Sequence, residues 1–441
     1  MTAGARAISL ATILGVALVA GHTSGNAATS SGPIDILHYD VSMSVDFNDR
    51  TITGETAILF RVIAPDQRSL SFSGNALNVT GAYLGRETLS ISRRGSALVI
   101  GLPGALPSGT TQKITLTYEG KPARGLVFGP RSVYSGYFAC DWMICPLDAP
   151  GDKATITMTL LVPEGMTSLG PGRLLSRSGA GPGLERQVWR EDRPYSSYLY
   201  GFALGDFHQA TAKAGSTDLV YLSATATPDR LTTLFAPTGD MLLFFQDKAG
   251  VPFPHARYVQ VHDSGSDAQE AANFSIIGDG VIAPSLADPQ DDWAIAHELA
   301  HQWWGNSITC TDWSQFWLNE GVTVFMVAAW KEHRWGRAAY DKELGLLQTR
   351  VDEASRTGVD RPLTYSGTYP SLSLRRAIQY SKGALFMDRL RRELGDETFW
   401  RALKIYTRVY AGGVVESRDL QMSFERTSER NLSELFNAWV Y

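Results

Sequence analysis

The chain has 441 residues, which is long enough for two or three domains. Hydrophobic residues make up 44% and charged residues 19% of it, a composition that is typical of a folded globular protein and excludes disorder as its main state. The 40 Lys and Arg against 45 Asp and Glu give a net charge of −5, and no basic run interrupts this balance. We therefore expect no nucleic-acid partner.

The first residues have the pattern of an export signal. Arg6 precedes an apolar run from Ala7 to Ala20, which is too short to span a bilayer comfortably. Small residues follow, with a plausible cleavage site near Ala28. We expect a signal peptide at residues 1–28 and an exported protein, periplasmic or secreted. No later stretch approaches 18 uninterrupted apolar residues, so no membrane span is expected in the mature chain.

Three cysteines raise the question of a disulfide in such a chain. Cys140 and Cys145 lie five residues apart, close enough to bridge a tight loop, but the sequence leaves this pairing open. Cys310 is expected to be a buried small hydrophobic residue rather than a reactive thiol.

Two kinds of pattern follow one another along the chain. From about His38 to Asp206, short alternating segments rich in Val, Ile, Thr, Tyr and Phe predict an all-β domain of sandwich or saddle type. After about Ala210, apolar residues recur at helical spacing. The helical segments lie at 291–304, 315–335, 381–394 and 396–410. We expect an α+β fold, with an all-β domain at 29–209 and a mostly helical domain at 210–441.

The strongest chemical signal is the run from His297 to His301, which reads HELAH. On a helix, positions i and i+4 share one face, so both imidazoles can bind one metal ion. Glu298 can then reach a metal-activated water as general base. Glu320, separated from His301 by 18 residues, predicts a third ligand on a second helix that runs back antiparallel. Two His and one Glu are typical of a catalytic zinc site with an open fourth position.

These motifs resemble a known family. The run HELAHQWWGNSITCTDWSQFWLNEG is similar to the aminopeptidase N and leukotriene hydrolase family of zinc metallopeptidases, a group of gluzincins. The resemblance extends over nearly the whole mature chain and implies a saddle-like β domain followed by a thermolysin-like catalytic domain. It also implies a short form, because full-length members of the family continue with further C-terminal domains.

The resemblance assigns roles to single residues. It implies that His297, His301 and Glu320 hold one Zn²⁺ per chain and that Glu298 moves the proton of the attacking water. It also implies that Tyr380, in the segment YSKGA, stabilises the oxyanion. A peptide would be the substrate, and a homo-oligomer remains conceivable.

One family motif is altered in this chain. Aminopeptidases of the family carry Gly-Ala-Met-Glu-Asn before the zinc helix, and its Glu binds the substrate's α-amino group. The corresponding run is Gln269 to Asn273, in which Asn273 is kept but Ala272 stands at the position of that Glu. If 269–277 is an exposed strand, Glu270 faces the same side as Ala272 and could substitute for it. Such a strand could also pair with a substrate main chain.

The second amine anchor of the family, a Gln or Glu in the β domain, is also replaced. The matching position is Tyr134 or Tyr137. Asp141, Asp263 and Asp267 are further candidates for a compensating carboxylate.

Several functions remain open on this basis. The first is an exported zinc metallopeptidase that is aminopeptidase-like with a rewired amine site. Alternatives are an endopeptidase or a peptidase for N-blocked peptides, a hydrolase of esters or epoxides, and a non-catalytic peptide-binding protein. The last is disfavoured, because all five metal-binding and catalytic side chains are kept.

Overall fold

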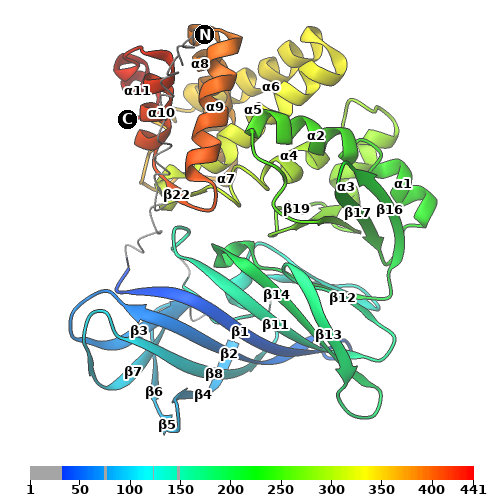
Figure 1. The fold of residues 1–441 in the computed structure, drawn as a ribbon, viewed down its shortest axis with the longest axis vertical. Helices are drawn as coiled ribbons and strands as arrows, with labels where there is room; N and C mark the ends of the chain where they lie inside the picture. Colours follow the sequence, from blue (N-terminus) through cyan, green and yellow to red (C-terminus); the bar gives the residue numbers. More distant parts are fainter. Residues whose placement is uncertain (1–31, 74–76, 123, 147–148) are drawn as a thin grey trace, which may run out of the picture.

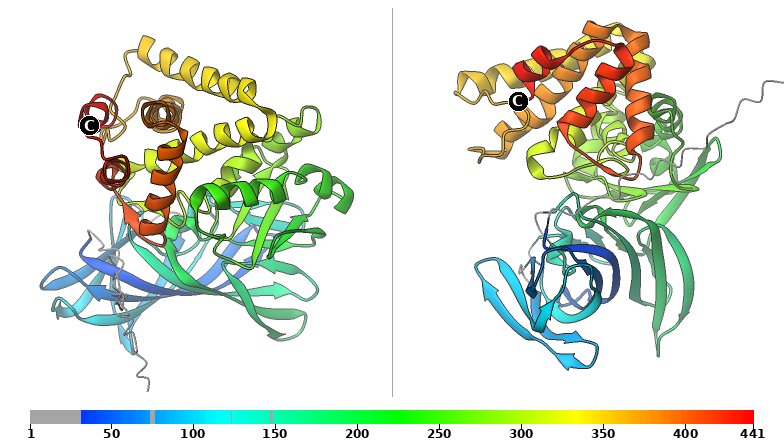
Figure 2. Two further views of the ribbon diagram at one scale, coloured as in Figure 1. Left: turned by 45° about the horizontal axis from the view of Figure 1, so that its top comes forward. Right: turned by 60° about the vertical axis from the view of Figure 1, so that its left-hand side comes forward.

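The computed structural model describes residues 32–73, 77–122, 124–146 and 149–441. They form an all-β part, drawn from blue to green, and a second part with most of the helices, drawn from green to red (Figure 1). The two parts stack on each other, so that the helical part covers one end of the β part (Figures 1 and 2). The α+β architecture expected from the sequence is confirmed, whereas the expected signal peptide at 1–28 lies outside the described residues.

An eight-stranded sheet is the frame of the β part. Its order is β13-β14-β11-β1-β2-β8-β4-β5, and every adjacent pair is antiparallel except β1 and β11. Alternation along the strands places one face in the core, as with Tyr39, Val41 and Met43 on β1. The strands are β1 Ile34–Asp46, β2 Thr51–Val62, β4 Leu77–Leu84, β5 Glu87–Thr88, β8 Thr111–Gly120, β11 Lys153–Pro163, β13 Arg173–Gly179 and β14 Leu184–Ser196.

Two smaller sheets complete the β part. One contains β3 Gln67–Ser73, β6 Ser90–Arg94 and β7 Ala97–Leu106, and the other contains β9 Leu126–Phe128, β10 Ser132–Ser135, β12 Thr167–Leu169 and β15 Ala203–Gly205. Beyond β10, Cys140 and Cys145 form a disulfide with their Cα atoms 5.2 Å apart, which answers the question that the sequence left open. Cys310 is free and buried, as expected.

The second part begins with a five-stranded sheet in the order β16-β17-β18-β20-β19. Its strands are β16 His208–Ala214, β17 Thr217–Ser223, β18 Arg257–Asp263, β19 Ala268–Gln269 and β20 Phe274–Gly278. The domain boundary expected at 209–210 thus falls within β16. The expected exposed strand at 269–277 is wrong: β19 and β20 form a buried hairpin, because the backbone turns at Asn273 with a φ of 65°.

Helices account for most of the remaining chain. The four predicted helices are present as α4 Trp293–Ala300, α5 Trp317–Trp335, α8 Gly383–Leu394 and α9 Asp396–Tyr410. The others are α1 Pro228–Leu234, α2 Thr238–Ala249, α3 Asp279–Ile282, α6 Arg337–Arg356, α7 Leu372–Arg376, α10 Ser417–Ser428 and α11 Ser433–Trp439. A short parallel pair, β21 Thr309–Cys310 and β22 Val414–Val415, joins the loop after α4 to the loop after α9. Over the part of the chain that the structure describes, no helix is long and apolar enough to cross a membrane.

Candidate metal centre and active site

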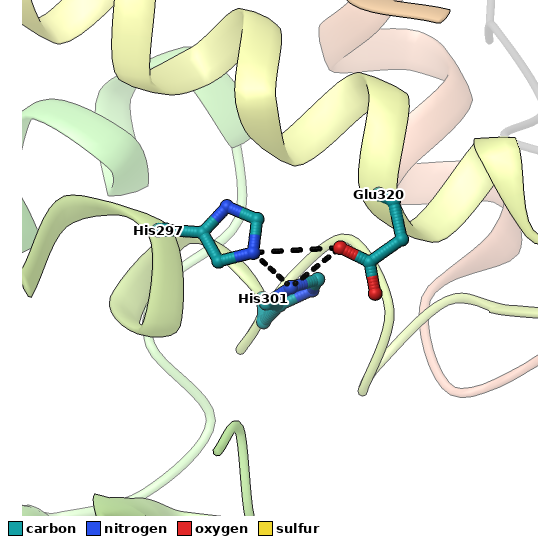
Figure 3. A group of neighbouring side chains, drawn as sticks. All are labelled: His297, His301 and Glu320. Atoms are coloured by element: carbon teal, nitrogen blue, oxygen red, sulfur yellow. Dashed lines mark hydrogen bonds and ion pairs between the residues drawn. The ribbon is translucent and has the colours of Figure 1, made fainter. Parts of the chain in front are cut away.

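Three buried side chains meet between α4 and α5. His297 lies in α4, His301 directly follows it, and Glu320 lies in the first turn of α5. The Nε2 atoms of the two histidines are 3.1 Å apart, and each is 3.4 Å from Oε2 of Glu320 (Figure 3). Within the described ranges these residues form the group that could hold a metal ion.

The orientation of His301 leaves one nitrogen for a metal. Its Nδ1 donates to the carbonyl oxygen of Trp304 at 3.0 Å, since a carbonyl can only accept. When this ring is neutral, as a metal ligand must be, its lone pair is on Nε2, which faces His297 and Glu320. Thr323, one turn beyond Glu320, has its hydroxyl 3.3 Å from the same Nδ1 and donates to the Trp304 carbonyl at 3.0 Å. His297 stacks on Trp293, with ring centroids 4.3 Å apart.

The charges around the three side chains favour a cation at this point. Burial alone would lower the pKa of His301, but the carboxylates of Glu320, Glu270 and Glu298 raise it to about 10. Burial would likewise raise the pKa of Glu320, but the two histidines hold it down, at about 2. A positive charge among these groups is therefore strongly stabilised.

The donor set fits zinc. With ligand bonds of about 2.0–2.1 Å, a tetrahedral zinc requires neighbouring ligand atoms to be about 3.3 Å apart. The separations of 3.1 and 3.4 Å agree with that spacing. Oε2 of Glu320 is buried and receives no hydrogen bond from the described protein groups, although each imidazole lies at ion-pair distance. Nitrogen and carboxylate donors of this kind are those of catalytic zinc sites.

Glu298 lies next to this group and is also buried. Burial, together with the charges of Glu270 and Glu320, raises the pKa of its carboxyl well above the ordinary value. One of its carboxylate oxygens is buried without a hydrogen bond from the described protein groups. The side chain is therefore suited to accepting and releasing a proton at this point.

Tyr380 belongs to a π-helical turn, Ala377–Lys382, between α7 and α8. Its ring stacks over His297 at a centroid distance of 6.4 Å, and the charge of the Glu320 carboxylate acts on its hydroxyl. Burial and the charges of Glu320 and Glu270 raise the pKa of Tyr380 well above its usual range, so the hydroxyl stays protonated. Such π-helical turns occur frequently at functional sites.

Two glycines allow the close approach of α5 to this turn. A Cβ atom added at Gly321 would lie 2.8 Å from the Cα atom of Gly383, so no larger residue fits between the helices. Gly321 follows Glu320 in the chain, and Gly383 follows the turn that carries Tyr380. The contact therefore positions a metal-ligand candidate beside the tyrosine.

The segment from Glu270 to Asn273 is held by side chains that follow the metal-binding helix. Oε1 of Gln302 accepts the Asn273 backbone N–H at 3.1 Å, and Nε2 of the same residue donates to the Ala271 carbonyl at 3.0 Å. Asn306 Nδ2 donates to the Glu270 carbonyl at 2.9 Å. The sequence interpretation missed both amide residues, although they stand in the run HQWWGN that continues the metal motif.

Glu270 and Ala272 have different surroundings in this segment. Ala272 is buried and donates its N–H to the Leu199 carbonyl at 2.8 Å. Glu270 is buried close to the three metal-ligand side chains, because its charge acts on His301 and Glu320. Burial and the Glu320 charge raise the pKa of the Glu270 carboxyl. A carboxylate is therefore present near the site, two residues before the position that the family motif assigns to it.

Asn273 is engaged by the β part. Its Oδ1 accepts the Gly172 N–H at 2.8 Å, and its Nδ2 donates to the Gly172 carbonyl at 3.2 Å. Both ends of the amide are thus paired with backbone. Together with the Gln302 contact, this pairing fixes the turn rather than leaving the side chain for a ligand.

The two tyrosines considered as second anchor lie in different environments. Tyr134 is buried against Phe207, with ring centroids 6.0 Å apart. Tyr137 is 43% exposed, and removal of its hydroxyl from water, with the charges of Glu298 and Glu270, raises its pKa well above the usual value. Of the two tyrosines, Tyr137 is therefore the candidate for a second anchor near the metal-ligand side chains.

The aspartates proposed as compensating carboxylates have other contacts. Asp141 is buried and paired with Arg124 at 3.1 Å. Asp263 accepts the Gly265 N–H at 2.6 Å, and Asp267, just before β19, accepts the Gly278 N–H through its backbone carbonyl at 2.8 Å. Glu270 is the carboxylate among these candidates whose charge acts on the metal-ligand side chains.

Comparisons with known proteins agree with this site. The family model described as the peptidase family M1 domain matches residues 235–439, which include His297, His301, Glu320 and Tyr380. An M1 zinc metallopeptidase from Deinococcus radiodurans has the same fold, with a TM-score of 0.77 at 21% identity over 93% of this chain and 95% of that one.

Curated relatives extend the likeness over the β part. Aminopeptidase M1-B of Oryza sativa subsp. japonica is 25% identical over 92% of this chain and 49% of its own length. Aminopeptidase N of Lactococcus lactis subsp. lactis is 24% identical over 91% of this chain and 50% of its own length. The chain thus spans about half the length of these two relatives. The matched model shows that residues 235–439 form a peptidase family M1 domain, and the relatives and the solved structure extend the likeness over most of the remaining chain.

Proposed function

We propose that the protein is a zinc aminopeptidase that adds water across the first peptide bond of short peptides. The observation that carries this proposal is the gathering of Glu298 and Tyr380 around the three metal-ligand side chains, all within one buried region. His297, His301 and Glu320 would hold the metal. A zinc ion held there would lower the pKa of a water molecule and polarise the substrate carbonyl.

The remaining chemistry falls to the side chains of the chain itself. Glu298 would take one proton from the attacking water as its oxygen adds to the carbonyl carbon, and would then pass that proton to the amine nitrogen, so that the C–N bond breaks as the carbonyl re-forms. Its raised pKa suits a group that must hold the proton between these steps. The Tyr380 hydroxyl would donate a hydrogen bond to the developing oxyanion, which its protonated state allows.

Glu270 is the residue that we assign to the substrate's ammonium group. A buried ammonium requires a paired negative charge, which Ala272 cannot supply. Glu270 is buried, its charge acts on His301 and Glu320, and its main chain is held by Asn306. These contacts favour an aminopeptidase with a moved amine anchor over an endopeptidase or a peptidase for N-blocked peptides. Asn273 would position this segment through Gly172.

The test compares one short peptide with a free amino terminus and the same peptide acetylated. Wild-type enzyme should cut the free form alone, and Glu298→Gln should remove that cleavage while retaining zinc. Glu270→Gln should raise KM for the free peptide by about ten- to a hundredfold, the usual loss for a charged hydrogen bond. Glu164→Gln, an exposed residue beyond β11, is the matched control.

Two results would contradict this assignment. Equal cleavage of the acetylated peptide would show that the enzyme needs no free amine, and would favour the endopeptidase reading. Cleavage of neither peptide above the Glu298→Gln background would remove the peptidase assignment and favour the ester-hydrolase or binding-protein readings.

We also propose that the protein is exported to an oxidising compartment. The pattern of residues 1–28 and the disulfide between Cys140 and Cys145 support this, because disulfides persist mainly in exported proteins. The mass of the mature protein recovered from its native host measures the cleavage directly. An intact N-terminus, with both thiols free, would contradict it.

A further inference from the structure

A pair of arginines precedes the tyrosine of the site. Helix α7 ends at Arg376 and continues without a break into the π-helical turn that carries Tyr380. Residues four apart are neighbours on a helical surface, and here Arg375 Nε donates to Gln379 Oε1 at 2.6 Å. The same spacing makes Arg376 the surface neighbour of Tyr380.

The charge of Arg376 reaches the site. Burial is the largest cause of the lowered pKa of His297, and Arg376 lowers it further. The same guanidinium opposes the upward shift that burial and the carboxylates impose on Tyr380. The Glu270 carboxylate acts on the same tyrosine in the opposite direction and raises its pKa.

Arg376 is exposed and has no carboxylate, hydrogen-bond acceptor or aromatic partner among the described residues. Its neighbour Arg375 lies over the ring of Phe316 at 5.1 Å and has no carboxylate partner in the same described part of the chain. Phe316 in turn contacts Tyr380 edge to face, with centroids 6.2 Å apart. Nearby Lys382, by comparison, is paired with Asp360 at 2.7 Å. Two guanidinium groups without carboxylates therefore flank the tyrosine.

The dimensions match a short peptide. We place the substrate amine near Glu270 and the scissile carbonyl beside Tyr380. In an extended peptide, a carboxylate one or two residues further along then lies about 3.5–7 Å from that carbonyl. That distance is within the reach of an arginine side chain. The planar guanidinium matches the two oxygens of a carboxylate in a bidentate pair.

We propose that Arg376, assisted by Arg375, binds a substrate carboxylate on the leaving-group side of the scissile bond. This inference rests on the proposed peptidase function. The carboxylate is either the C-terminal group of a di- or tripeptide or the side chain of an acidic residue there. The enzyme is therefore selective for short or acidic peptides, with a negative charge close to the bond that it cuts.

Four dipeptides separate the two sources: Ala-Ala, its C-terminal amide, Ala-Glu amide and Ala-Gln amide. With the wild-type enzyme, kcat/KM should be about ten- to a hundredfold higher for Ala-Ala than for its amide if the terminus is bound. The same ratio of kcat/KM between Ala-Glu amide and Ala-Gln amide would show that the enzyme binds the acidic side chain. Arg376→Gln should abolish whichever of these two preferences the wild type shows. The kcat/KM of the two substrates without a carboxylate, Ala-Ala amide and Ala-Gln amide, should change less than twofold. Arg375→Gln should reduce the preference only in part.

Arg86→Gln is the matched control, because Arg86 is exposed in the turn between β4 and β5, at the far end of the β part (Figure 1). The inference is overturned if wild type prefers neither carboxylate, or if Arg376→Gln slows all four substrates equally. The latter result would mean that Arg376 only positions Tyr380.

A binding measurement separates this inference from the proposed function. Calorimetry of Ala-Ala and its amide on zinc-loaded Glu298→Gln reports carboxylate recognition without turnover. Tighter binding of the acid, lost in the double variant Glu298→Gln/Arg376→Gln, supports the inference even if wild type cuts no peptide. Equal binding of acid and amide overturns the inference even if wild type is an active peptidase.

Discussion

Lys153 and Asn306 join the β part to the metal-binding part. Nζ of Lys153, on β11, donates to the Asn306 carbonyl oxygen at 3.1 Å and to the Ser307 carbonyl oxygen at 2.8 Å. Lys153 is buried, and Asn306 in turn donates to the Glu270 carbonyl. The buried Lys153 amine, whose pKa burial lowers to about 7, thus supports the loop that positions the carboxylate assigned to the substrate amine.

Lys153→Met should destabilise the protein and weaken substrate binding. It removes two hydrogen bonds to backbone carbonyl groups, and we expect a loss of about 1–3 kcal/mol in the free energy of unfolding. KM for a free-amine peptide should rise more than kcat falls, because the loop holds Glu270 rather than Glu298. Denaturant unfolding and steady-state kinetics measure both effects, with the exposed Lys342→Met on α6 as control. An unchanged KM would show that the loop keeps its place without Lys153.

Tyr380→Phe should lower kcat about a hundred- to a thousandfold, the usual loss for one oxyanion donor. The ring and its stacking on His297 are retained, so KM, zinc content and the melting temperature should change little. A variant with normal kcat would remove Tyr380 from the chemistry and leave it a packing role. Tyr365→Phe, on a tyrosine that packs against Tyr369, is a suitable control.

Removal of the metal should destabilise the fold around α4 and α5. The ion would join α4 to α5 through Nε2 of both imidazoles and Oε2 of Glu320, and this link is lost when the metal is removed. A ligand present at a hundred times its Kd adds about 2.7 kcal/mol to stability, so chelation should lower the melting temperature by several degrees. Glu320→Ala should melt at the same temperature with and without chelator. A wild-type protein that melts unchanged after complete zinc removal would contradict this expectation.

The buried Asp152, at the start of the β11 segment, should make stability depend on pH. Burial raises its pKa from 3.8 to about 7, even though its Oδ1 accepts the Ile36 N–H at 3.1 Å. Between these values the folded state binds more protons than the unfolded state, so stability falls as pH rises from about 4 to 7. The penalty is fully present above pH 7 and amounts to at most about 4 kcal/mol.

Asp152→Asn keeps the acceptor oxygen and removes the charge. Its melting temperature should exceed that of wild type at pH 8, and the difference should shrink toward pH 4. Melting curves across this range measure the gap between the two proteins, which cancels the contribution of other titrating groups. A gap that does not depend on pH would show that Asp152 keeps an ordinary pKa in the folded protein.

Local patterns in the sequence determined the elements and much of the metal site. Alternation from about His38 onward predicted β-strands, which the structure shows in β1 with Tyr39, Val41 and Met43 buried, and helical spacing predicted α4 and α5 to within a few residues. The spacing of His297 and His301 predicted a shared face because that relation depends only on the helical period. The four-residue separation needs no knowledge of the rest of the fold.

Tertiary structure decided what no local period can specify. Glu320 reaches the histidines because α5 returns past α4, and Gly321 and Gly383 let α5 approach the turn that carries Tyr380. The turn at Asn273, held by Gln302 and Gly172, replaced the expected strand. These contacts join residues tens to a hundred positions apart, so their geometry depends on how whole elements pack rather than on the pattern of any one segment.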